Sequence, residues 1–203
     1  MSTSSLFVEL MVIGVGGSAW LMMLLAWGLN VNVTQIKPFA SSPIVSIAAL
    51  ALTYLIGILV DRLADAAFSL ARADRKLLSL FNNYKSYLDA RTKVLAKSPP
   101  LANLHEYNRS RQRICRGWTV NFILLALIVG LRIPPSLFDN VDRTISTASG
   151  AFLLFMALAC WFAWESLYGA ELCRVKDHLA LLENRPRSIT LPEPSNVGDS
   201  EDG

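Results

Sequence analysis

Charged residues are scarce in this chain of 203 residues. Asp, Glu, Lys and Arg make up 17% of it, whereas soluble domains hold about 25%. Apolar residues reach 53%, and the mean hydropathy is +0.39. These apolar residues gather in four long blocks instead of spreading at helical or strand period along the chain. The composition therefore disfavours both a soluble enzyme and a disordered chain.

Cysteine and histidine are also rare. The three cysteines, Cys115, Cys160 and Cys173, form no CxxC pair, so neither a metal motif nor a disulfide scaffold is indicated. His105 and His178 are far apart in sequence and belong to no HExxH motif, and neither GxSxG nor a P-loop occurs. We therefore expect a protein that is not an enzyme, with no catalytic residue, no metal and no cofactor.

The four apolar blocks have the length of membrane spans, since about 20 apolar residues cross about 30 Å of hydrocarbon as a helix. They cover residues 6–29, 43–61, 117–133 and 145–168. Ser42 and Pro43 suit the start of the second helix, and Pro134-Pro135 ends the third. The sequence predicts an all-α integral membrane protein with four transmembrane helices and helical cytoplasmic extensions.

The basic residues indicate the orientation of these helices. Twelve of the nineteen Lys and Arg residues lie in 62–116 and four lie in 174–187, which leaves three in the two short loops. Because basic residues flank spans on the cytoplasmic side, we expect both termini inside a multi-pass inner or plasma membrane protein. The expected parts are residues 1–62 (helices 1 and 2), 63–116 (a cytoplasmic extension), 117–169 (helices 3 and 4), 170–185 (a cytoplasmic helix) and 186–203 (a disordered tail).

Small residues recur at helical spacing within the spans, which allows close approach of helix backbones in a bilayer. The spacing fits packing inside one four-helix bundle and fits contacts in a homo-oligomer equally well. The candidates for helix packing or oligomerisation are Gly14, Gly17, Ser18, Ala49, Thr53, Gly57, Ala159 and Ala163.

Polar residues at matching depth near the inner surface form a second candidate group. Charges inside a membrane usually face protein or water, so these residues predict one polar layer, with Arg62 or Arg116 bridging carboxylates. The layer fits an ion site, a proton site or a switch, and it also fits helix ends that reach the lipid headgroups. Its members are Glu9, Asp61, Arg62, Asp65, Asn121 and Glu165.

The extension after the second span carries an apolar heptad repeat, which is typical of a coiled coil. Neither Gly nor Pro occurs between Ile58 and Lys97, so a single helical arm is one possibility. A reversal near Asn82 is the other, because the return from Leu101 is about half as long. The predicted seam consists of Leu63, Leu70, Leu77, Leu80, Tyr84 and Tyr87.

The same extension is strongly basic, with eleven Lys or Arg and three acidic residues in 72–116. This charge suits anionic lipids of the inner leaflet and also an acidic cytoplasmic protein partner. Aromatic residues are too sparse there to indicate nucleic acid. The candidate partner or lipid contacts are Arg72, Arg75, Lys76, Lys85, Arg109, Arg111, Arg113 and Arg116.

The layout of a long cytoplasmic segment between spans two and three is similar to stator-type proton channels and to large-pore four-helix channels. In size and plan the chain also resembles the small multi-span membrane subunits of bacterial anti-phage systems, such as the Kiwa membrane component. This resemblance concerns architecture and carries over no residue. It implies an oligomeric, non-enzymatic membrane sensor or scaffold whose cytoplasmic helices bind a soluble partner. The alternative is an ion- or proton-conducting channel lined by Glu9, Asp61, Asn121 or Glu165.

Overall fold

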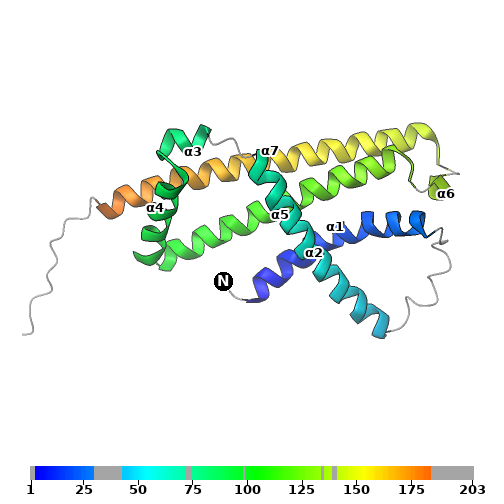
Figure 1. Ribbon diagram of the computed structural model, residues 1–203, viewed down its shortest axis with the longest axis horizontal. Coiled ribbons are helices and arrows are strands. Elements are labelled where there is room, and N and C mark those ends of the chain that lie inside the picture. The colour runs from blue at the N-terminus through cyan, green and yellow to red at the C-terminus, as the bar shows by residue number, and fades with distance from the viewer. Residues whose placement is uncertain are drawn as a thin grey trace, which may run out of the picture.

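Figure 1 shows the computed structural model of the protein, which describes residues 3–29, 43–71, 75–97, 99–133, 135–138 and 141–183. All elements in these ranges are helices, so the predicted all-α fold is confirmed. The predicted tail, 186–203, lies outside the described residues. The helices are α1 (Thr3–Gly28), α2 (Pro43–Ala71), α3 (Arg75–Leu80), α4 (Tyr84–Lys97), α5 (Pro99–Gly130), α6 (Pro135–Phe138) and α7 (Arg143–Glu183).

Four of these helices are long and apolar enough to cross a membrane. The candidate spans are Leu6–Gly28 in α1, Pro43–Ser69 in α2, Ala102–Gly130 in α5 and Arg143–Leu182 in α7. They overlap all four predicted blocks. The first and third end slightly before the predicted residues 29 and 133, and the second, third and fourth extend well beyond the predicted blocks at one end. The chain therefore has the architecture of a multi-pass membrane protein.

Helices α5 and α7 form the long antiparallel pair of the molecule (Figure 1). The 41 residues of α7 extend over about 60 Å at 1.5 Å per residue, which is about twice the thickness of a hydrocarbon core. Their apolar parts lie together, so residues 99–116 of α5 accompany residues 169–183 of α7 at the opposite end. We call these two segments, with α3 and α4, the basic platform.

Helices α1 and α2 cross with their backbones in contact. A Cβ atom on Gly14 would lie 1.9 Å from the carbonyl oxygen of Thr53, and one on Gly57 would lie 2.0 Å from that of Leu10. Ser18 Oγ and Thr53 Oγ1 lie 3.3 Å apart beside this crossing. Only glycine permits such an approach, because any side chain would force the two helices apart.

The predicted small residues thus divide into two groups. Gly14, Ser18, Thr53 and Gly57 contact one another inside the chain, and a Cβ on Gly17 would meet Ile56 Cγ2 at 2.5 Å. The remaining members, Ala49, Ala159 and Ala163, are exposed on the outer faces of α2 and α7.

We expect Gly14→Ala to destabilise the protein by about 1–3 kcal/mol, the usual cost of overpacking, because the new methyl group overlaps the α2 backbone. Unfolding by SDS in mixed micelles measures the change. Gly28→Ala is the matched control, since its Cβ would meet nothing within 4 Å. Equal stability of the two variants would contradict the backbone contact.

The turn after α5 is closed by a Schellman motif. Ile133 N–H donates to the carbonyl of Ile128 at 2.9 Å and Arg132 N–H to that of Val129 at 3.2 Å, which is the bonding pattern that ends many helices. Arg132 has a φ of 55°, a conformation more usual for glycine. Its guanidinium Nη2 donates to the carbonyls of Phe138 and Val141. The Arg132 side chain thus links the end of α5 to the end of α6 and to the residues just before α7.

The extension after α2 is divided into separate helices and folds back. Helix α2 ends at Ala71, α3 begins at Arg75, and residues 81–83 bend before α4 begins at Tyr84. Asn83 causes this break by acting as the N-cap of α4: its Oδ1 accepts from Ser86 N–H at 2.7 Å and from Ser86 Oγ at 2.9 Å. Of the two possibilities left open by the sequence, the structure has the reversal near Asn82.

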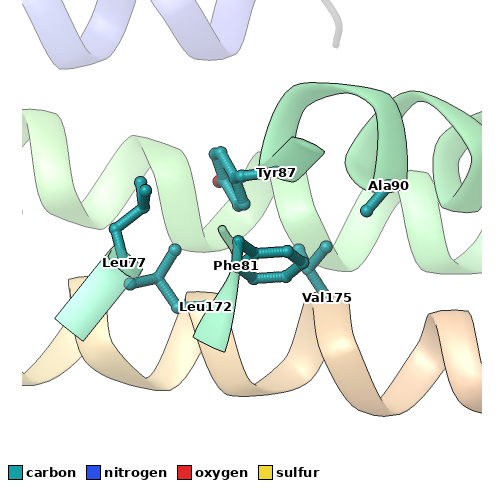
Figure 2. Close-up of a cluster of buried hydrophobic side chains, with 6 residues drawn as sticks. All are labelled: Leu77, Phe81, Tyr87, Ala90, Leu172 and Val175. Carbon is teal, nitrogen blue, oxygen red and sulfur yellow. The ribbon is translucent and has the colours of Figure 1, made fainter. Parts of the chain in front are cut away.

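The heptad seam therefore does not form one coiled coil. Leu63 is 53% exposed and Tyr84 is 51% exposed, whereas Leu77, Leu80 and Tyr87 pack against α7 within the same chain. Figure 2 shows this cluster, in which Leu77, Phe81, Tyr87 and Ala90 surround Leu172 and Val175. The seven-residue spacing has a different physical origin: α3 and α4 each present one apolar face to α7. The side chain of Leu70 is not described.

Candidate functional site

A network of ion pairs joins α1, α2 and α5 where the apolar spans meet the basic platform. Arg113 Nη1 donates to Glu9 Oε2 at 3.1 Å, and Arg113 Nε lies 3.6 Å from Asp61 Oδ1. Arg116 Nη2 lies 3.9 Å from the same Asp61 oxygen, while Arg116 Nη1 donates to Asp65 Oδ1. Two arginines of α5 thus pair with three carboxylates from two other helices.

This network contains half of the predicted polar layer and changes its bridging residues. Glu9 and Asp61 are buried, as a polar layer requires, and Arg116 bridges carboxylates as expected. Arg113 is the second bridge, in place of Arg62, which is exposed on α2. Glu165 lies on α7, where it is partly buried. Arg113 and Arg116 were predicted to contact a partner or lipid, but both are only about 15% exposed and engaged with these carboxylates.

Asn121 is fully buried and joins α5 to α1. Its Nδ2 donates to the carbonyl oxygen of Ile13 at 2.9 Å, and its Oδ1 accepts from Trp20 Nε1 at 3.0 Å. The side chain fits because Gly16 has no Cβ, which would otherwise lie 2.5 Å from Nδ2. Inside a bilayer such bonds hold helices together. Asn121 therefore acts as a packing contact within one chain.

We expect Arg113→Gln to destabilise the protein by about 3–5 kcal/mol, because it leaves the buried Glu9 and Asp61 without their shared cation. The free energy of unfolding in mixed micelles measures this loss. Arg62→Gln, on the exposed side of α2, should leave stability near wild type. Adding Glu9→Gln and Asp61→Asn to Arg113→Gln should recover much of the loss. A triple variant as unstable as the single one would contradict a charge-pairing role.

The two histidines of the chain meet in the basic platform. His105 Nδ1 and Glu171 Oε1 lie 2.7 Å apart, and His105 Nε2 lies 3.4 Å from His178 Nδ1. His105 is 0% exposed, and Glu171 is also buried. The His105 ring thus faces Glu171 with Nδ1 and His178 with Nε2. This chain of polar groups ties α5 to α7 at two levels.

A polar cavity of about 230 Å³ lies between α2, α4, α5 and α7. We call it the platform cavity. Its cationic lining consists of Arg91 from α4 and of Arg109 and Arg116 from α5, and its acidic lining consists of Asp65 and Glu171. Four aromatic side chains complete its walls: Tyr84, Tyr87, Trp164 and Tyr168. Arg116 and Asp65 belong both to this cavity and to the ion-pair network.

The remaining predicted basic contacts differ in their surroundings. Lys85, Arg109 and Arg111 are exposed, and the Arg111 guanidinium carbon lies 5.3 Å from the Tyr107 ring centroid. Arg75 and Lys76 belong to α3, whose side chains at these positions are not described, and Arg72 lies outside the described residues.

Sequence reasoning missed Arg91, His105, Glu171 and His178 as members of one region. Their grouping depends on α4 folding back between α5 and α7, and no motif within the chain marks that arrangement. The one local signal was the Asn82-Asn83 pair, which favours a turn between Leu80 and Tyr84.

Burial raises the pKa of Tyr87 from its ordinary value of 10.0 to about 12, with the nearby Arg91 acting in the opposite direction. A folded-state pKa above the unfolded value means that the contribution of this neutral phenol to stability is complete below pH 10. We therefore expect stability to fall between about pH 10 and 12, by roughly 2–3 kcal/mol for this side chain. In a spectrophotometric titration, Tyr87→Phe should remove a tyrosine that ionises late. An unchanged late phase would contradict the burial effect.

Comparison of the chain with protein-family models, with curated proteins and with solved structures finds no match. Within the described residues, His, Cys, Asp and Glu side chains form no group of three that could hold a metal ion.

Proposed function

We propose that this chain is a non-enzymatic membrane protein whose basic platform faces the cytoplasm, binds an acidic soluble protein and couples that binding to the packing of the membrane helices. The observation that carries the proposal is the position of Arg116. Its guanidinium pairs with Asp61 and Asp65 of a membrane helix and also lines the platform cavity. A change at the platform surface can thus reach the spans through one side chain.

The charge of the platform supports its proposed orientation and the proposed chemistry of its partner. Exposed basic side chains lie on all three of its long elements, namely Lys85 and Lys93 of α4, Arg109 and Arg111 of α5, and Arg174 and Lys176 of α7. Such a surface favours the cytoplasmic side and attracts both acidic proteins and anionic lipid headgroups. Both termini would then be cytoplasmic.

The apolar surface supports assembly of several copies in the membrane. Residues 43–52 of α2 are exposed throughout, with Ile44 79% exposed. We include a homo-oligomer in the proposal, with this part of α2 and the exposed Ala49 as its contact surface. The resemblance to membrane subunits of anti-phage systems would place the coupling in bacterial phage defence, and that assignment stays a prediction.

Cross-linking in cells of the native source, followed by purification, tests the partner. We expect the wild-type chain and Arg143→Glu, at the opposite end of α7, to retain the same acidic cytosolic protein. The double variant Lys85→Glu and Lys93→Glu should lose it, because charge reversal on α4 repels an acidic surface. Recovery of that protein with all three chains, or with none, would refute the proposed platform contact.

Amide exchange of the purified complex tests the coupling. Binding of the partner should change exchange at residues 57–65 of α2, which hold Asp61 and Asp65. Unchanged exchange there, with protection confined to the platform, would refute the coupling. The protein would then act only as a scaffold for its partner.

The channel alternative has less support from the geometry. Of the residues suggested to line an ion path, Glu9 and Asp61 are paired with Arg113, and Asn121 bonds to Ile13 and Trp20. Three of the four suggested residues are thus engaged with groups of the same chain. Planar-bilayer recording tests the alternative directly: conductance that Glu9→Gln abolishes would establish it against the scaffold proposal.

A further inference from the structure

The platform cavity contains polar atoms that lack hydrogen-bond partners. Arg91 Nε and Arg116 Nε are buried N–H donors with no acceptor, and Glu171 Oε2 is a buried acceptor with no donor. Each such group costs about 1–3 kcal/mol when left unsatisfied, and more when charged. Three orphaned polar atoms on residues that line one cavity therefore indicate an absent polar ligand.

The charges around the cavity specify the chemistry of that ligand. Asp65 pairs with Arg116, and the second acid, Glu171, pairs with His105. Arg91 and Arg109 add two further cations to the same wall. Guanidinium groups bind phosphate oxygens through paired N–H donors. The unpartnered Glu171 Oε2 can accept a hydrogen bond from a hydroxyl group of the ligand. A phosphate without such a hydroxyl group would leave this oxygen unpaired.

The size and position of the cavity limit the ligand further. About 230 Å³ is less than the roughly 300–1,000 Å³ of sites for drug-sized molecules, so the cavity suits one phosphate with a short polar substituent. It lies beside the ion-pair network, at the level where the apolar spans end. Basic pockets between membrane helices at this level bind lipid headgroups.

We propose that the platform cavity binds a phosphate ester that carries a hydroxyl group, with its phosphate held by Arg91, Arg109 and Arg116 and its hydroxyl donating to Glu171. The phosphate reaches the site either on an anionic lipid or on a small soluble ester. Tyr84 and Trp164 wall the cavity and limit the room for a larger substituent. The site requires no protein partner. The phosphate-ester proposal is therefore independent of the platform contact proposed above.

Occupation of this site has a consequence for the membrane helices. A phosphate on Arg116 Nε would share this guanidinium with Asp65, which accepts from Nη1, and a second anion on one cation weakens the first pair. The ligand would therefore weaken one link between α2 and α5 and leave the Arg113 pairs with Glu9 and Asp61 in place.

Binding to the purified full chain in maltoside micelles tests the proposal. One arm titrates short-chain phosphatidylglycerol, which has a phosphate and hydroxyls on a lipid, and the other titrates glycerol 3-phosphate. Native mass spectrometry counts bound molecules, and the fluorescence of the five tryptophans, which include Trp164 in the cavity wall, reports binding. We expect saturable binding of one ligand per chain in at least one arm, and the responding arm identifies the source of the phosphate.

Two variants and one control separate this site from general charge attraction. Arg91→Gln and Arg109→Gln, on different helices, should each weaken binding by about tenfold or more, as loss of a charge-assisted hydrogen bond does. Arg111→Gln removes the same charge from an exposed position on α5 outside the cavity and should change the affinity less than twofold. Because Arg109 is exposed, its variant tests the site even when Arg91→Gln fails to fold.

The outcomes that overturn the proposal are equally defined. Absence of saturable binding in both arms refutes it. Equal weakening by Arg109→Gln and Arg111→Gln also refutes it, because binding would then follow net charge alone. Tight binding of phosphatidylglycerol that is unaffected by both cavity variants would place the lipid elsewhere on the protein. This result would also refute the proposal.

Discussion

The pairing of buried carboxylates with Arg113 and Arg116 is the constraint on which the rest of the structure depends. Glu9 and Asp61 lie on helices that cross through bare backbone at Gly14 and Gly57, which brings both acids to the same level. Charges in such a position are tolerated only when they are paired. The cations come from α5, so the α1–α2 pair is fixed to the α5–α7 pair. Since α5 and α7 continue into the basic platform, the same pairing also fixes the position of the platform.

Much of this architecture follows from the sequence because the membrane imposes simple requirements. Apolar blocks of spanning length predicted all four long helices, and Pro43 predicted the first residue of α2. An isolated charge is costly in lipid. This cost predicted that Glu9 and Asp61 would be buried and that Arg116 would bridge carboxylates. Gly14 and Gly57 were recognisable as packing residues, although their partners were not.

Other features depended on contacts between distant segments and stayed beyond sequence reasoning. The heptad spacing of Leu80 and Tyr87 fits a coiled coil and fits two short helices on one neighbour equally well. The Asn83 cap breaks the helix between them. The sequence offered Arg62 and Arg116 as bridges, but helix rotation places Arg62 on the exposed face of α2 and brings Arg113 of α5 to the carboxylates instead. The platform cavity required α4 to pack against both α5 and α7, which no local pattern in residues 84–97 specifies.

Helix α2 takes an oblique path across α1 and α5 (Figure 1). Its residues 43–52, about a third of the helix, are exposed throughout. A tilted apolar helix changes its tilt when the hydrocarbon core thins or thickens. The exposed end of α2 lies on one side of its crossing with α1 at Gly14 and Gly57, and Asp61 and Asp65 lie on the other side, against Arg116. A change in the tilt of α2 would therefore move both acids relative to Arg116.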